Sequence, residues 1–169
     1  MGSLDVITVV AEPATGLELT QQSVERLGEL GVIVNWLVIV GQDSASIRGR
    51  IQSGVQRHIN QLIIREQRSD GIYGAINEGL ELVTGSFFII IHAGDVVLAN
   101  LAKELDQADP RRVTCFQSAW HDDSGTPCTY RRGQEPSCVL LGRMPNHQAM
   151  LFPRKLADEK YDETLPISG

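Results

Sequence analysis

The segment from Asp70 to Asp95 constrains the fold more than any other part of the chain. Its first half carries apolar residues at spacings of three and four, which places them on one face of a helix that can pack on a sheet. These residues are Ile72, Ile76, Leu80 and Val83. The unbroken apolar run from Phe87 to Ile91 is typical of a strand buried on both faces of a parallel sheet. We predict a helix that ends at Gly85, a buried strand, and then an acidic tip, His92-Ala93-Gly94-Asp95.

Strands and helices alternate through the first half of the chain. Apolar runs and amphipathic patterns predict strands at 4–10, 32–40 and 61–65 and helices at 18–30 and 46–57. The first helix should end at Gly31. The residues expected to form its inner face are Leu19, Ser23, Leu27 and Leu30. This alternation indicates an α/β fold with a mostly parallel, Rossmann-like sheet flanked by helices. Ligands bind beyond the carboxyl ends of the strands in such sheets, which makes the tip at Asp95 the first candidate site.

The pattern changes after Asp95. A helix is predicted at 99–107, followed by two antiparallel strands at 113–120 and 128–132 that a turn at 121–125 joins. A further strand is predicted at 147–152, and Pro153 can begin a short helix because proline is well tolerated in a first turn. We interpret residues 1–169 as a single domain whose second half is a small antiparallel extension.

Composition limits the classes of partner. The 169 residues carry a formal net charge of −6, which argues against nucleic acid because phosphate-binding surfaces are normally basic. No apolar run approaches the roughly 20 residues that span a bilayer, and no signal-peptide pattern is present. We predict a cytoplasmic protein without a transmembrane segment, and peripheral membrane association stays open. The cysteines, Cys115, Cys128 and Cys138, lack paired spacing, which argues against disulfides and a structural zinc site.

Two groups of residues resemble one known family. The central group resembles the signature of the family 2 glycosyltransferases of the GT-A fold. It consists of Gly71-Ile72-Tyr73, Ala75, Asn77, Gly79, Thr84-Gly85 and Ala93-Gly94-Asp95. The second group is similar to the family's acceptor-side segment, and it consists of Met144-Pro145-Asn146-His147-Gln148 and Tyr161-Asp162-Glu163. With the first strand and its helix, the resemblance covers nearly the whole chain.

The resemblance implies a metal-dependent transferase with a GT-A-like fold. Such an enzyme moves a sugar from a nucleotide-diphospho-sugar donor to a hydroxyl of a glycan or lipid-linked acceptor, in polysaccharide or glycolipid assembly. Residues 4–98 would bind the nucleotide sugar and 99–169 would form the acceptor side. A bound Mg²⁺ or Mn²⁺ would neutralise the diphosphate leaving group. Asp95 matches the last acid of the family's metal motif, and His92 is the candidate second ligand because imidazole suits Mn²⁺ better than Mg²⁺.

The same resemblance implies a set of binding residues. Candidates for the nucleotide-sugar site are Ala11, Glu12, Val40, Asp43, Gly71, Tyr73, Asn77, His92, Gly94 and Asp95. The candidates on the acceptor side are His147 and Gln148.

Several of these positions depart from the family pattern. The second strand leads into Val40-Gly41-Gln42-Asp43-Ser44-Ala45, which lacks both of the usual aspartates, although Asp43 can reach the same space. Ser69 and Gly74 stand where the family carries acids, and Ala11-Glu12 replaces an aromatic residue and an asparagine. These departures predict altered or lost recognition of the base.

Alternative interpretations remain. Inverting members of the family use a carboxylate as general base soon after the Tyr-Asp-Glu segment, so the base is expected beyond Gly169, and the acceptor half is predicted to be incomplete. A non-catalytic domain that serves as a scaffold or partner would also explain the missing acids. Asp95 could cap the following helix, and His92 could be a structural strand-end residue. A nucleotidyltransferase is disfavoured because no glycine-rich phosphate loop follows the first strand.

Overall fold

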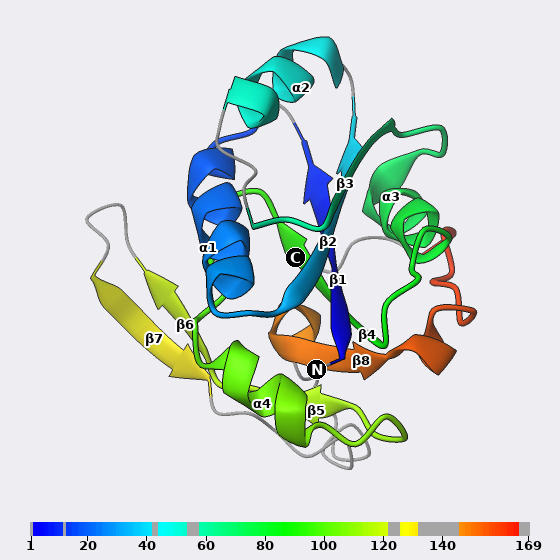
Figure 1. Ribbon diagram of the computed structural model, residues 1–169. Helices are drawn as coiled ribbons and strands as arrows, with labels where there is room; N and C mark the ends of the chain where they lie inside the picture. Colours follow the sequence, from blue (N-terminus) through cyan, green and yellow to red (C-terminus); the bar gives the residue numbers. More distant parts are fainter. Residues whose placement is uncertain are drawn as a thin grey trace.

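The computed structural model describes residues 2–11, 13–41, 44–53, 58–121, 126–131 and 146–165. Within this part of the chain, one sheet has the strand order β3-β2-β1-β4-β8-β5 (Figure 1). Its strands are β1 (Ser3–Val10), β2 (Ile33–Val40), β3 (Gln61–Glu66), β4 (Phe87–His92), β5 (Thr114–Cys115) and β8 (Met150–Pro153). The first four strands run parallel, and β8 is antiparallel to β4 and to β5. The predicted α/β class and mostly parallel, Rossmann-like sheet are confirmed.

Helices cover both faces of this sheet, as Figure 1 shows. They are α1 (Leu17–Glu29), α2 (Ser44–Ser53), α3 (Gly71–Leu80) and α4 (Leu101–Gln107). Buried residues of α1, α2 and α4 share one core cluster with Val6 and Trp36, whereas those of α3 share the other cluster with Ile7 and Ile90. Both faces of β1 and β4 are therefore buried, which explains their continuous apolar sequence. No helix in the described residues is long and apolar enough to cross a membrane.

The helix ends differ from some predictions. Gly31 ends α1 as expected, with a φ of 87° and a hydrogen bond from Val32 N to Leu27 O of 3.2 Å. However, Leu19 and Leu30 do not face inward, because their side chains are 54% and 39% exposed. Ser23 and Leu27 are buried as expected, and Thr20 and Val24 complete the inner face in place of the two exposed leucines.

Gly85 does not end α3, which stops at Leu80. The main-chain amides of Thr84 and Gly85 instead donate to the buried carboxylate of Asp5, both at 2.6 Å. A Cβ atom at Gly85 would lie 2.9 Å from Asp5 Oδ1, so this position requires glycine for space. The predicted helix at 46–57 is α2, and residues 54–57 lie outside the described part of the chain.

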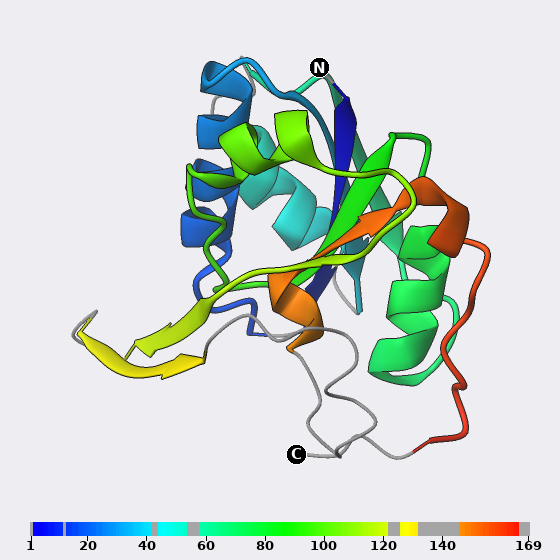
Figure 2. The same ribbon diagram turned by 90° about the horizontal axis from the view of Figure 1, so that it is seen from below.

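The second half of the chain corrects two strand predictions. The single strand expected at 113–120 divides into β5, in the main sheet, and β6 (Ser118–His121). β6 pairs only with β7 (Pro127–Arg131) among the described strands, and the two form a ribbon that extends from the body (Figures 1 and 2). The strand expected at 147–152 begins as a 3₁₀ turn, η2 (His147–Ala149), before β8. Pro153 does precede a short 3₁₀ helix, η3 (Arg154–Leu156).

The reason for the turn at η2 is a local cap. The side-chain oxygen of Asn146 accepts a hydrogen bond of 3.2 Å from the main-chain amide of Gln148. Such a bond satisfies an amide at the start of a helical turn and so competes with an extended conformation.

The space around two helical glycines, one in α3 and one in α2, predicts opposite effects when each is replaced by alanine. A Cβ atom at Gly79 would lie 2.4 Å from Ile7 Cγ2, whereas one at Gly49 in α2 would meet nothing within 4 Å. We expect Gly79→Ala to lower the free energy of unfolding by about 1–3 kcal/mol because it overpacks the core. Gly49→Ala should raise it by up to about 1 kcal/mol through helix propensity. Denaturant titration would measure both, and a stabilising Gly79→Ala would contradict this packing.

Candidate functional site

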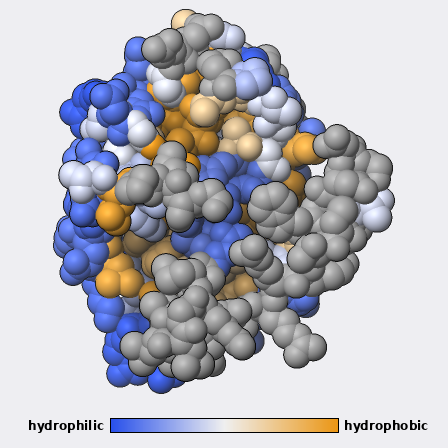
Figure 3. Space-filling model, turned by 180° about the vertical axis from the view of Figure 1, so that it is seen from behind, coloured by the Kyte–Doolittle hydropathy of each residue, from blue (hydrophilic) through white to orange (hydrophobic). Residues whose placement is uncertain are grey.

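The carboxyl ends of β1, β2 and β4 lie next to one another. Ala93 N donates to Val9 O and Gly41 N donates to Val10 O, each at 3.1 Å. Figure 2 shows η2 on the side toward which β1 and β4 run, opposite the start of β1. Seen from behind, this side has a hydrophilic area at its centre with hydrophobic residues around it (Figure 3). Because ligands of open α/β sheets bind beyond the carboxyl ends of the strands, this side holds the candidate site.

The tip after β4 brings three predicted residues together. Asp95 Oδ2 accepts a hydrogen bond of 2.7 Å from His92 N and one of 2.8 Å from Gln148 Nε2. The turn is closed by Asp95 N, which donates to His92 O at 3.0 Å, and Gly94 adopts a φ of 99° that favours glycine. Among the described residues, no hydrogen-bond donor contacts the other carboxylate oxygen, Oδ1. One oxygen of Asp95 is thus anchored and the other remains available.

Two residues of α1 that the sequence analysis did not select as site residues also hold this tip. Thr20 Oγ1 donates to Asp95 O at 2.7 Å and accepts from Gly94 N at 2.9 Å. Ser23 Oγ accepts from Val97 N at 3.1 Å. A hydroxyl on the inner face of a helix is a weak signal, because threonine and serine in helices often bond to their own main chain. Only the pairing of β4 with β1 brings residues 74 positions apart into contact.

Two histidines line the same region. The rings of His92 and His147 meet edge to face with centroids 5.9 Å apart. Burial lowers the pKa of His92, against the opposing effect of Asp95. Burial lowers the pKa of His147 as well, and the neighbouring His92 adds to this effect. Both shifts favour neutral imidazole, the form that binds metals. Nε2 of His147 is buried without a hydrogen-bond partner in the described part of the chain.

Tyr73 and Asn77 of α3 bind the segment that resembles the family's Tyr-Asp-Glu motif. Asn77 Nδ2 donates to Tyr161 O at 3.0 Å and to Glu163 Oε1 at 2.8 Å, and Asn77 Oδ1 accepts from Tyr161 N at 2.8 Å. The rings of Tyr73 and Tyr161 stack with centroids 5.4 Å apart. Burial raises the pKa of Tyr161, and Tyr73 adds to the shift. The Tyr161 ring also lies 6.4 Å from that of His147, which connects this segment to the tip.

A buried acid that sequence analysis missed orders the loop before α3. Glu78 accepts hydrogen bonds from Arg68 N at 2.7 Å and Ser69 N at 2.8 Å. Burial acts to raise the pKa of Glu78, but the hydrogen bonds from Ser69 and Arg68 outweigh it and lower that pKa. The ionised carboxylate therefore fixes the loop that leads to Gly71, where α3 begins with a φ of 74°.

The other predicted residues have different positions. Glu12 and Asp43 lie outside the described residues. Ala11 is exposed beyond the end of β1. Val40 is 1% exposed and belongs to the core, so its side chain cannot contact a nucleotide without repacking.

The metal-binding atoms at the tip suit a cation that is coordinated partly by the protein and partly by a bound nucleotide. Within the described part of the chain, no group of three or more histidine, cysteine or acidic side chains is placed to hold a metal ion. The tip offers Asp95 Oδ1 and the neutral imidazole of His92. Mg²⁺ with a nucleotide is commonly held by one or two carboxylates together with phosphate oxygens. The set thus fits a cation that a diphosphate brings with it.

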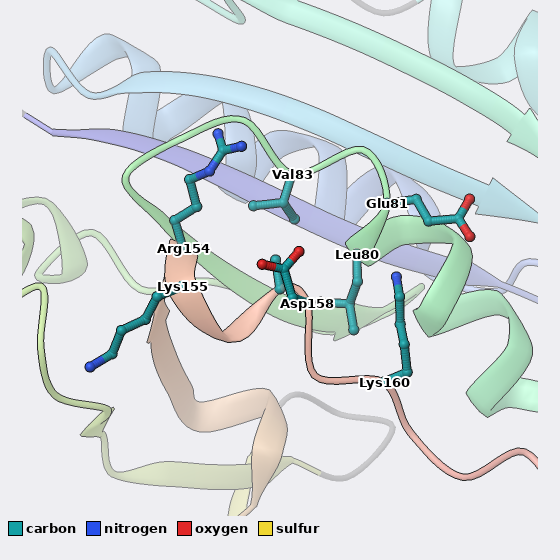
Figure 4. A pocket seen from close by; sticks show the side chains of 8 residues that line it. Leu80, Glu81, Val83, Arg154, Lys155, Asp158 and Lys160 are labelled. Carbon is teal, nitrogen blue, oxygen red and sulfur yellow. The ribbon is translucent and has the colours of Figure 1, made fainter.

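A cavity of about 570 Å³ lies elsewhere, between the end of α3 and residues 154–160 (Figure 4). Its basic side chains bind main-chain carbonyls. Arg154 Nη1 donates to Thr84 O at 2.7 Å, and Lys160 Nζ donates to Asn77 O at 3.0 Å. Because Phe87 at the start of β4 pairs with Pro153, this cavity is at the opposite end of the strand from Asp95. Arg154 and Lys160 thus hold the segment that leads to Tyr161, the residue that Asn77 binds.

The fold is GT-A-like. No protein-family model matches the sequence, and no curated protein matches it either. Solved structures do match the fold. Residues 1–349 of Staphylococcus aureus TarS in complex with UDP-GlcNAc give a TM-score of 0.65 at 11% identity, over 93% of this chain and 47% of that one.

Two further structures show the same similarity. The mannosyltransferase PcManGT from Pyrobaculum calidifontis, in complex with GDP-Man and Mn²⁺, gives a TM-score of 0.64 at 15% identity and covers 97% of this chain and 48% of its own. HddC from Yersinia pseudotuberculosis gives a TM-score of 0.52 at 14% identity and covers 98% of this chain and 86% of its own. The present chain thus spans about half the length of TarS 1–349 and PcManGT. At these identities the likeness is one of fold.

The contacts of Asn77 predict that it anchors residues 161–163. We expect Asn77→Ala to lower the free energy of unfolding by about 1–3 kcal/mol, because it leaves main-chain groups of Tyr161 unpaired. Glu163→Ala is the matched control: Glu163 is exposed, and its loss leaves the other bonds of Asn77 intact, so the cost should be no more than about 1 kcal/mol. Chemical denaturation would measure both. Equal effects of the two variants would contradict the anchoring role.

Proposed function

We propose that this chain is the nucleotide-sugar-binding part of a family 2 glycosyltransferase. It would transfer a sugar from a nucleotide-diphospho-sugar donor to a hydroxyl of a glycan or lipid-linked acceptor, in polysaccharide or glycolipid assembly. The observation that carries the proposal is the position of Asp95 at the carboxyl end of β4, with Oδ2 anchored and Oδ1 available. The solved complexes of TarS with UDP-GlcNAc and of PcManGT with GDP-Man and Mn²⁺ support it through their shared fold.

The residues of the tip would have separate tasks. Asp95 would bind Mg²⁺ or Mn²⁺ through Oδ1, with His92 as a second donor. The cation would neutralise the negative charge that develops on the diphosphate leaving group. Gln148 would hold Asp95 in orientation through its bond of 2.8 Å to Oδ2, and His147 would line the acceptor side next to it. We assign no general base among the described residues.

The residues at the candidate donor site also motivate a rival function. Acids that the resemblance leads one to expect are replaced at Val40, Ser69 and Gly74, and Val40 is a core residue. A domain that kept the fold but lost nucleotide binding would act as a scaffold or partner of another transferase. A cytoplasmic location and peripheral contact with a membrane-held acceptor belong to the first proposal and are not required by the second.

Calorimetric titration of the purified chain with UDP and with GDP, each with and without Mn²⁺, tests the proposal. We expect one nucleotide to bind in a metal-dependent manner. Asp95→Asn should weaken this binding by about tenfold or more, equivalent to roughly 1.4 kcal/mol, because it removes the charge that faces the cation. Asp109→Asn is the control, since it makes the same change in an exposed turn where Asp109 pairs with Arg111.

The two functions give different results in this experiment. Metal-dependent binding that Asp95→Asn weakens and Asp109→Asn preserves would support the transferase. If neither nucleotide bound under any condition, the transferase proposal would be wrong and the scaffold function would stand. Binding that did not depend on Mn²⁺ or on Asp95 would show that the nucleotide site lies elsewhere.

A further inference from the structure

The first turns of α1 hold the main chain of the tip. Thr20 is fully buried, and its hydroxyl both donates to Asp95 O at 2.7 Å and accepts from Gly94 N at 2.9 Å. Ser23 Oγ accepts from Val97 N at 3.1 Å and donates to Thr20 O at 2.8 Å. The side-chain hydroxyls therefore bind main-chain atoms on both sides of the Asp95 carboxylate.

The main chains also meet at a point where no side chain fits. Gly16, which precedes α1, has a φ of 77°, and a Cβ atom there would lie only 2.7 Å from the Cα atom of Gly94. Gly94 itself has a φ of 99°. Two residues in glycine-favouring conformations thus allow α1 to approach the tip closely enough for Thr20 to bond with it.

These contacts determine where the available oxygen of Asp95 lies. The carboxylate is bound through Oδ2 to His92 N and to Gln148, and the main chain of the same residue is bound to Thr20. With main chain and Oδ2 both anchored, the torsion angles of the Asp95 side chain have little freedom, so the position of Oδ1 is set before any ligand arrives. Pre-organised ligands bind a cation with less loss of conformational entropy.

We propose that Thr20 and Ser23 are positioning residues for the cation and diphosphate site, acting through Asp95 and without contacting the ligand. This inference rests on the proposed function, because it assigns Asp95 to the cation. It differs from a purely structural role in one respect. Loss of the Thr20 hydroxyl should affect the metal requirement of nucleotide binding, and not only the stability of the fold.

Three threonine variants separate these roles. Thr20→Val keeps the shape of the side chain and removes the hydrogen bonds of the hydroxyl with His92, Gly94 and Asp95, whereas Thr20→Ser keeps the hydroxyl. Thr8→Val is the matched control, because Thr8 is also fully buried and accepts a bond of 2.9 Å from Trp36 Nε1 in the core, without contacting the tip. Ser23→Ala tests the second hydroxyl. Each variant would be titrated with Mn²⁺ at a fixed concentration of UDP or GDP, with thermal unfolding recorded in parallel.

We expect Thr20→Val to raise the Mn²⁺ concentration for half-maximal nucleotide binding by about tenfold, and Ser23→Ala to raise it by a smaller factor. Thr20→Ser should keep the wild-type Mn²⁺ requirement. Thr8→Val should lower the melting temperature and leave the Mn²⁺ requirement unchanged. Hydrogen exchange provides a readout that needs no ligand: the amide of Gly94 should exchange faster in Thr20→Val and not in Thr8→Val.

Failure of the inference and failure of the proposed function look different. A wild-type chain that bound no nucleotide would overturn the proposed function and this inference with it. If the wild type bound and Thr20→Val had an unchanged Mn²⁺ requirement, the positioning role would be wrong while the proposed function stood. A Thr8→Val variant that raised the requirement as much as Thr20→Val would likewise overturn it, because general destabilisation would then account for the effect.

Discussion

The buried carboxylate of Asp5 sets the register on which the rest of the sheet depends. Asp5 lies in β1 without solvent exposure and accepts hydrogen bonds of 2.6 Å from Asn35 in β2 and from the main chain of Thr84 and Gly85 before β4. Asn35 in turn accepts a bond of 2.8 Å from Asn60 at the start of β3. A buried carboxylate without partners is costly, so the network fixes the starts of neighbouring strands relative to one another.

This register determines the site at the other end of the strands. Because β1 and β4 run parallel with Val9 opposite His92, the tip after β4 emerges beside the end of β1 and the first turns of α1. Polar bonds thus align the amino ends, apolar side chains fill the middle, and the carboxyl ends present Asp95. The basic residues near η3 belong to the amino end, where they bind carbonyls of α3 and of the turn before β4.

The predictions that succeeded concern segments whose local sequence pattern and tertiary environment favour the same secondary structure. The strands β1, β2 and β4 are buried on both faces, and this makes their sequences continuously apolar. Predictions failed where a long-range contact decided the outcome. Leu19 and Leu30 have the right spacing for an inner face, but they are exposed, and Thr20 faces the tip together with Ser23, the one of these two residues that was expected to face inward. The strand expected at 113–120 divides because β5 pairs with β8 while β6 pairs with β7.

Local sequence pattern was therefore sufficient for the order and type of most elements and for a candidate site at the tip that ends in Asp95, whereas His92 and Gln148 were selected as binding residues from the resemblance to the glycosyltransferase family. Hydrophobic periodicity and turn residues act over a few positions, so they can be recognised in the sequence alone. The partners of Asp95 were decided by tertiary structure, since hydrogen bonds from Thr20 and Gln148 span 75 and 53 positions in the sequence. No local signal can encode such pairs, because they form only when strand pairing and helix packing have brought distant segments together.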